Sequence, residues 1–509
     1  MPINEKHTME NKRTSDLDSF AIGAGVGLVG RFAGRFIGVA AGIITARVLG
    51  PAVFGVYAIG LTMFGLAELV TPLGFDVGVI KYGAGFLGRD NRKLKGVILY
   101  SLLGSMLFSV LAGLCVYLLS SWLASSVFLK PTLRDVIRLY SFAFPLAGLV
   151  GVLAAASRLT RNMIYSAAVQ DVGEPLLALA ILGIFWLIGL NLDRVVMTDL
   201  IAYGLVTALA LAIIAVLFPF VFDRRVVPIP PDRHYYGYSF SAAFSMLLGT
   251  LVFWVDRLFV GSLLPASQAG IYQSAAQISV VFAVVISGFN RILTPVFSSL
   301  YHEKDIGQLE EIYRIGTKWT VYISMPVLIL LLLSSKDFLA IVYGDAYSPG
   351  ALALVVLLIG QLVNLATGSI GPLMLIGGYQ RIVILSSALV MGVNALVCFL
   401  LIPRFGILGA ALANTISVAL LNLSALLIVK IKMKVWPYDR RYLKGGAAAL
   451  TALAAAFLVK TVVVLPRVSE MIVLFAAVTG VFGLVLFLLR IDPEDRALVG
   501  LLTRRRTGR

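Results

Sequence analysis

Charged residues, histidine and cysteine are all scarce in this sequence. Asp, Glu, Lys and Arg together make up 13% of the 509 residues, about half of their share in a soluble globular protein. Because so few charges cannot cover a water-exposed surface, an ordinary soluble fold is excluded. The three histidines lie far apart, and the two cysteines, Cys115 and Cys398, lie within apolar stretches. We therefore expect no bound metal, and the cysteines indicate nothing about the redox compartment.

Long polar segments are missing as well. No polar break approaches the roughly 50 residues of the smallest usual domain. The longest breaks lie near 76–96, 121–137, 223–237, 299–314 and 430–444. No GxxxxGK[ST] phosphate loop occurs, so the chain has no such site for ATP hydrolysis. The net charge of +16 resides mostly in short loops without interleaved stacking aromatics, which argues against a nucleic-acid partner.

What the chain has in abundance is long apolar runs. Hydrophobic residues make up 59% of it, and the mean hydropathy is +0.95. Many of the runs exceed the roughly 20 residues that cross a bilayer as a helix. The pattern predicts an all-α integral membrane protein with about fourteen transmembrane helices. The spans are expected near 21–46, 54–75, 97–120, 138–157, 173–191, 199–222, 238–263, 271–298, 315–334, 350–376, 382–402, 407–429, 445–465 and 470–489.

The distribution of Lys and Arg predicts the orientation. If the N-terminus is cytoplasmic, 29 of the 42 Lys and Arg residues fall in inside segments, nine fall in outside segments and four fall well within spans. Positive charge is enriched on the cytoplasmic side of membrane proteins. An even number of spans places both termini on one side, and both tails are basic. We therefore expect both termini to be cytoplasmic.

Two pairs of spans share a sequence pattern. The first pair is joined by LGPA at 49–52 and GVY at 55–57, and the second by LLPA at 263–266 and GIY at 270–272. Turns between helices favour Pro and Gly in any case, so chance is the alternative. The functional interpretation is two homologous six-helix lobes, a recurrent device of secondary transporters. The expected parts are an N-terminal tail (1–20), an N-lobe (21–222), a linker (223–237), a C-lobe (238–429), two accessory spans (430–489) and a basic tail (490–509).

Three stretches resemble a known family. They are FGVYAIGLTMFGLAELVTPLGFDVGVIKYGA at 54–84, VDRLFVGSLLPASQAGIYQSAAQIS at 255–279 and LIPRFGILGAALANTIS at 401–417. With the fourteen-span layout, they resemble the polysaccharide-transporter flippases of the multidrug/oligosaccharidyl-lipid/polysaccharide superfamily. The resemblance covers roughly residues 15–490 and is specific for the branch rather than for the cargo.

The resemblance implies a flippase, not an enzyme, that moves polyprenyl-diphosphate-linked oligosaccharide from the cytoplasmic to the outer leaflet by alternating access. It implies the cell (inner or plasma) membrane of a prokaryote as the location. Its partners would be the lipid-linked oligosaccharide, membrane lipids, and a glycan polymerase or glycosyltransferases. No cofactor is expected, but coupling to H⁺ or Na⁺ stays open, with Glu68 and Asp256 as candidate carriers.

Charged residues inside the spans are the candidate site, because each costs roughly 2.5–3.5 kcal/mol at mid-bilayer. Arg31 and Arg35 are four residues apart in the first span and therefore share a helical face. Glu68, in the second span, comes to a similar depth as Arg31. We predict an Arg31–Glu68 pair that leaves Arg35 free to face a cavity and to bind phosphate. A purely structural ion network is the alternative.

Other polar residues within the spans are further candidates for the site. Asp256 and Arg257 could pair with neighbouring helices or close a gate, and Arg291 could extend to the cytoplasmic interface instead. Gln273 and Gln277 share a face and could bind sugar hydroxyls, although amides in spans also join helices.

Two other functions remain open at this point. Multidrug efflux within the same superfamily would favour an anionic cavity for cationic drugs, whereas the first span is doubly basic. A membrane glycan polymerase or ligase would usually need a sizeable outer loop carrying acid–base groups, and the outside breaks are short.

Overall fold

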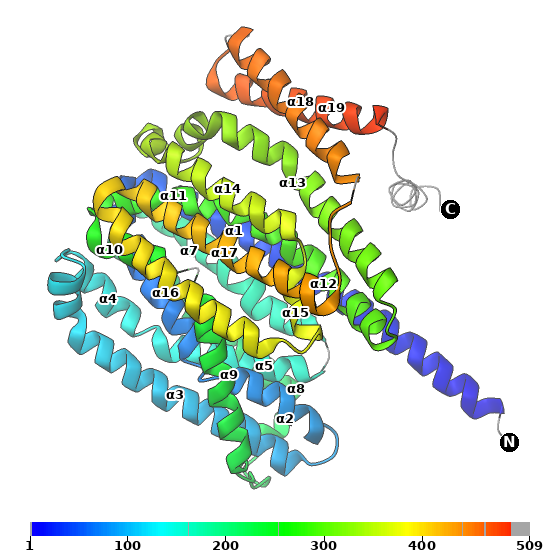
Figure 1. Ribbon diagram of the computed structural model, residues 1–509. Coiled ribbons are helices and arrows are strands. Elements are labelled where there is room, and N and C mark those ends of the chain that lie inside the picture. Colours follow the sequence, from blue (N-terminus) through cyan, green and yellow to red (C-terminus); the bar gives the residue numbers. More distant parts are fainter. Residues whose placement is uncertain (1–2, 161, 253, 440, 463–464, 490–509) are drawn as a thin grey trace. The chain divides into compact units, whose positions relative to one another are not determined.

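The computed structural model describes residues 3–489 except 161, 253, 440 and 463–464, with side chains described from Gly30 onward except that of Met163. The expected basic tail, 490–509, lies outside these residues. The described part of the chain is helical and contains no strand, as predicted for an all-α membrane protein. Figure 1 shows the helices. The chain divides into two compact units, residues 1–270 and 271–509, whereas the expected lobe boundary at 223–237 stays a prediction.

The first unit contains the N-terminal helices. They are α1 (Ile3–Val70), α2 (Phe75–Phe86), α3 (Asn91–Trp122), α4 (Leu133–Ser141), α5 (Phe144–Ser157), α6 (Met163–Ser166), α7 (Gly173–Ile188), α8 (Leu192–Leu217), α9 (Arg233–Leu251) and α10 (Val255–Leu263). Short turns of other helical types lie between them: η1 (Leu123–Val127), η2 (Arg158–Thr160), η3 (Ala167–Asp171) and η4 (Pro219–Val221).

The division between the units falls within α11 (Ala266–Ser279). The second unit then contains α12 (Val281–His302), α13 (Ile306–Tyr343), η5 (Asp345–Gly350), α14 (Ala351–Thr367), α15 (Ile370–Ile376), α16 (Gln380–Phe405), α17 (Ile407–Met433), α18 (Arg441–Val462) and α19 (Arg467–Leu488). The last two helices form a hairpin, and the alanines Ala448, Ala452 and Ala456 give α18 a fully buried small-residue face. Small residues at this spacing let helices in a membrane approach closely.

Eleven of the described helices are long and apolar enough to cross a membrane, or thirteen if each of two bent pairs is one span. The expected number was about fourteen. The stretch Gly30–Phe86 counts once, although its 57 residues would extend about 85 Å as a straight helix, far more than one crossing of about 30 Å needs. Its backbone leaves the helical region at Gly50 (φ 70°, ψ 168°), which divides α1 into two stretches that each suffice for a crossing.

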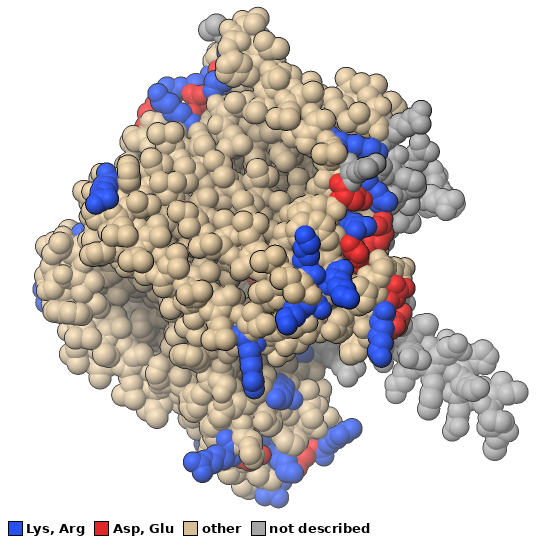
Figure 2. Space-filling view, viewed as in Figure 1, with Lys and Arg blue, Asp and Glu red and all other residues tan. Residues whose placement is uncertain are grey.

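The outer surface suits lipid as its solvent. Large apolar side chains are widely exposed, and Leu187 and Val216 reach 83% and 80% exposure. Figure 2 shows that most of the visible face carries no charged side chain and that charges gather in a few patches. Water would not tolerate so much exposed apolar surface on a monomer. The chain is therefore a multi-pass membrane protein.

The two turn motifs that suggested an internal repeat lie against each other. A Cβ added to Gly55 would lie 1.7 Å from the carbonyl oxygen of Ala266, and one added to Gly270 would lie 2.1 Å from the carbonyl oxygen of Pro51. Each glycine thus lets one motif touch the backbone of the other. The contact is reciprocal, whereas the homology of the two lobes stays a prediction.

Candidate functional site

The first candidate residue, Arg31, forms an ion pair on α1. Its Nε lies 2.8 Å from Oδ1 of Asp171, the last residue of the π-helical turn η3. Close backbone packing fixes this arrangement. A Cβ on Gly30 would lie 3.2 Å from the Val172 side chain, and one on Gly34 only 1.5 Å from the Asp171 carbonyl oxygen. Because these glycines seat α1 directly on η3, the neighbouring Arg31 is held beside Asp171.

The expected Arg31–Glu68 pair is wrong. Glu68 is exposed on α1 and forms no ion pair among the described residues. Arg31 turns to η3 instead, because the glycine contacts place that turn, rather than the second half of α1, next to its side chain. Similar depth along two helices did not determine which faces meet.

Arg35 lies one turn further along α1, and its side chain is exposed. Among the described residues it forms no ion pair or hydrogen bond. A permanent positive charge in an apolar span without an internal partner is costly. An anion from outside the chain would therefore bind Arg35 favourably.

A third arginine lies near this part of α1. Arg158, in η2, donates from Nη2 to Oε1 of Gln170 at 2.5 Å. Its charge is repelled by that of Arg31 and attracted by Asp171 and Asp76. Arg158 follows the span expected near 138–157, and it was not among the predicted site residues. No sequence pattern links it to Arg31, which is 127 positions away.

Carboxylates and buried tyrosines form a second group in the first unit, which we call the acid–tyrosine group: Glu68, Glu174, Asp199, Tyr57, Tyr140 and Tyr203. Tyr140 and Tyr57 donate to Oδ2 of Asp199 at 2.6 and 3.1 Å. Within the described part of the chain, none of the three carboxylates forms an ion pair. Asp199 was not predicted as a site residue, because the expected span began there, whereas α8 begins seven residues earlier.

The residues around α10 are tightly enclosed. Asp256 is 1% exposed, and the guanidinium carbon of Arg257 lies 5.0 Å from the ring centre of Trp254. A cation over an indole face is an attractive arrangement. Outside the spans, Lys130 donates to the Gly261 carbonyl at 2.5 Å, and burial lowers the pKa of its ammonium group. These contacts are consistent with a structural role for α10.

The remaining sequence candidates belong to the second unit. Gln273 and Gln277 are half-buried on α11, and the Tyr343 hydroxyl lies 3.4 Å from Oε1 of Gln277. Arg291 is half-buried on α12 and takes part in a polar interaction. Since each unit is described by itself, these residues are not placed relative to Arg31 and Arg35.

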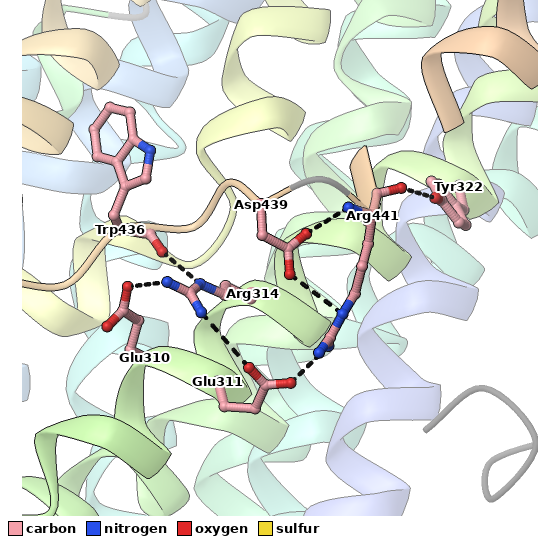
Figure 3. Close-up of polar contacts among 7 residues, drawn as sticks. All are labelled: Glu310, Glu311, Arg314, Tyr322, Trp436, Asp439 and Arg441. Carbon is pink, nitrogen blue, oxygen red and sulfur yellow. Dashed lines mark hydrogen bonds and ion pairs between the residues drawn. The ribbon is translucent and has the colours of Figure 1, made fainter. Parts of the chain in front are cut away.

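A network of charges in the second unit has a structural role. Arg441, at the start of α18, contacts Glu311 of α13 at 2.6 Å, and Arg314 of α13 donates to the Trp436 carbonyl at 3.1 Å (Figure 3). Together they fasten the non-helical segment 434–439 to α13. At the other end of α18, Lys460 lies 3.6 Å from Asp337 of α13. Both ends of the accessory hairpin are thus attached to one helix.

Residues 44–351 match the family described as polysaccharide biosynthesis protein. The matched region is more than half of the chain. It includes the repeat motifs, the acid–tyrosine group and Asp171, which is the ion-pair partner of Arg31.

Curated relatives have related names. CapF of Staphylococcus aureus, a capsular polysaccharide biosynthesis protein, is 26% identical over 34% of this chain and 44% of its own length. The probable flippase AglR of Haloferax volcanii is 23% identical over 39% of this chain and 43% of its own length. The putative O-antigen transporter of Shigella flexneri is 24% identical over 74% of this chain and 89% of its own length. The chain thus spans less than half the length of the first two.

Solved structures with a similar fold are transporters. The lipid II flippase MurJ in an inward closed conformation superposes with a TM-score of 0.70 at 13% identity, over 91% of this chain and 99% of MurJ. An inward-facing multidrug resistance transporter of the MATE family gives 0.60 at 17% identity, over 81% of this chain and 98% of that chain. At these identities the likeness shows the fold alone.

Proposed function

The chain belongs to the polysaccharide biosynthesis protein family, and from this premise we propose that it is a flippase for polyprenyl-diphosphate-linked oligosaccharide. It would carry this lipid from the cytoplasmic to the outer leaflet of a prokaryotic cell membrane by alternating access, with both termini cytoplasmic. The names of the flippase and transporter relatives support this class of cargo.

One observation carries the proposal: Arg31 and Arg35 present exposed positive charge from one face of an apolar span. Arginine matches phosphate oxygens with a planar fork of donors and stays charged at any working pH. The diphosphate of the cargo would bind these arginines, while Gln273 and Gln277 offer amides suited to sugar hydroxyls. The polyprenyl chain would remain in lipid. Glu68, Asp256, Arg257 and Arg291 are then left for ion coupling or gating.

Substitution of Arg35 tests the proposal. We expect Arg35→Ala to reduce export of surface glycan at least about tenfold, because a charge-assisted hydrogen bond contributes roughly 1.5–3 kcal/mol. Arg35→Lys should retain part of the activity, since it keeps the charge and loses the fork. The measurement is surface glycan per unit of protein in the membrane fraction of a strain that lacks its own flippase.

The acid–tyrosine group favours a second function, multidrug efflux, because carboxylates without an internal cation suit cationic compounds. The same strains distinguish the two functions. If the wild-type protein confers resistance to cationic dyes but restores no surface glycan, its function is multidrug efflux and not lipid flipping. Glycan export that is normal in Arg35→Ala would remove this residue from the site.

A further inference from the structure

One turn of π-helix in the first unit holds two arginines that come from distant parts of the chain. Asp171 of η3 contacts Arg31 from α1 at 2.8 Å, and the preceding Gln170 accepts from Arg158 of η2 at 2.5 Å. Turns of π-helix are rare and occur frequently at functional sites, because the extra residue redirects neighbouring side chains. Here that turn brings two guanidinium groups to one place.

Closely packed helical backbone carries both arginines. Gly34 seats α1 against the Asp171 carbonyl so closely that no Cβ could fit between them. On the other side, Arg158 directly follows Ser157, which is 1% exposed, at the buried end of α5. Both arginines are therefore carried by helical segments, α1 and η2. Preorganised groups of this kind bind a ligand without a large ordering cost.

Only one of the two arginines at η3 has an ion-pair partner. Arg31 pairs with Asp171. Arg158 is repelled by Arg31 and attracted by Asp171 and Asp76, but it forms no ion pair among the described residues. The Arg31 side chain remains 51% exposed, and it contacts Asp171 through Nε, which leaves its terminal nitrogens available. A ligand that carries two adjacent negative charges would satisfy both arginines. A diphosphate has this chemistry, and its oxygens match the donors of guanidinium groups.

We propose that Arg31 and Arg158 form a diphosphate-binding site on η3, in which Asp171 occupies the phosphate position on Arg31 until the ligand displaces it. This proposal rests on the proposed function and deepens it, because it assigns the headgroup of the cargo to particular residues. Asp171 then has a positioning role. It keeps Arg31 oriented in the empty protein and competes with the ligand, so that the bound headgroup can be released.

The experiment measures binding of geranyl diphosphate, a short prenyl diphosphate, to the purified full-length protein in lipid nanodiscs by calorimetry. Arg158→Gln should raise Kd at least about tenfold, since it removes a charged donor. Asp171→Asn should lower Kd about two- to fivefold, because it removes a charge that competes with the ligand for the exposed Arg31. Arg158→Lys, which keeps the charge, should fall between Arg158→Gln and the wild type.

The control is Arg194→Gln, in the same unit. The Arg194 guanidinium donates to the backbone carbonyls of Ile188 and Gly189 and does not belong to the site. The Kd of the Arg194→Gln variant should therefore equal that of the wild type. Inorganic pyrophosphate is titrated in parallel. Equal affinity for both compounds would mean that the site takes free diphosphate, whereas tighter binding of the prenyl compound identifies a lipid headgroup.

Two results would overturn the site: a Kd for Arg158→Gln equal to the wild-type value, or weaker binding by Asp171→Asn. Thermal unfolding of each variant checks that it folds. Glycan export separates this proposal from the proposed function. If wild type and Arg158→Gln export equally well while Arg35→Ala does not, the flippase stands and the η3 site fails. If the binding pattern appears but wild type exports no glycan, the site stands and the flippase fails.

Discussion

At the scale of single residues, the structure shows how a carboxylate is kept within an apolar span. Asp199 lies two turns inside α8 and accepts hydrogen bonds from the hydroxyls of Tyr140 and Tyr57. Insertion of a charge at mid-bilayer costs roughly 2.5–3.5 kcal/mol, and charged acceptors gain roughly 1.5–3 kcal/mol per hydrogen bond. Two such hydrogen bonds, together about 3–6 kcal/mol, are enough to offset the cost of Asp199. They also join α1, α4 and α8.

Substitution of one tyrosine tests this contribution. Tyr140→Phe removes a single hydroxyl but keeps the ring, which stacks on Phe64 at 5.2 Å. We expect the free energy of unfolding to fall by about 1.5–3 kcal/mol, because Asp199 loses its shorter hydrogen bond. Thermal unfolding in detergent would measure the change. The matched control is Tyr117→Phe, a half-buried tyrosine whose hydroxyl has no hydrogen-bond partner among the described residues. Equal melting temperatures for both variants would contradict the argument.

At the scale of helices, apolar runs predicted where most elements lie but not how the backbone breaks. The span expected near 138–157 is divided into α4 and α5, which meet at 43°, and Pro145 lies in the first turn of α5, where proline is tolerated. The turn η3 was not predicted, because hydrophobicity does not distinguish a π-helical turn from an α-helical one. For this reason the sequence did not predict Asp171 and Arg158 as site residues, since η3 brings them together.

The glycines of the repeat motifs provide a test at this scale. Gly55→Ala should lower the free energy of unfolding by at least about 1–3 kcal/mol, because its Cβ would lie 1.7 Å from the Ala266 carbonyl oxygen and the backbones would have to separate. Gly204→Ala in α8 is the control, since no atom lies within 4 Å of its added Cβ. That substitution should be neutral or stabilising by about 0.4–1 kcal/mol. Similar thermal stability of the two variants would show that the motifs do not pack as described.

At the scale of the whole molecule, the class of protein followed from composition, whereas the site did not. An apolar chain with short polar breaks must cross a membrane many times, and the family match agrees with the resemblance carried by the three stretches. The partner of Arg31 depended instead on which helix faces pack together. Glycine contacts decide that packing, and neither helix depth nor charge pattern specifies it.

The number of crossings and the orientation can be tested together by cysteine labelling. In a protein whose Cys115 and Cys398 are replaced by alanine, a single cysteine is introduced at Asp193, at the start of α8, or at Arg225, in the polar break before α9; both positions are exposed. If the chain crosses the membrane as Lys and Arg predict, an impermeant maleimide should label Asp193→Cys in intact cells. It should label Arg225→Cys only after permeabilisation, because this break would be cytoplasmic. Labelling of Arg225→Cys in intact cells would reverse the orientation, and with it the side from which the arginines of α1 receive their ligand.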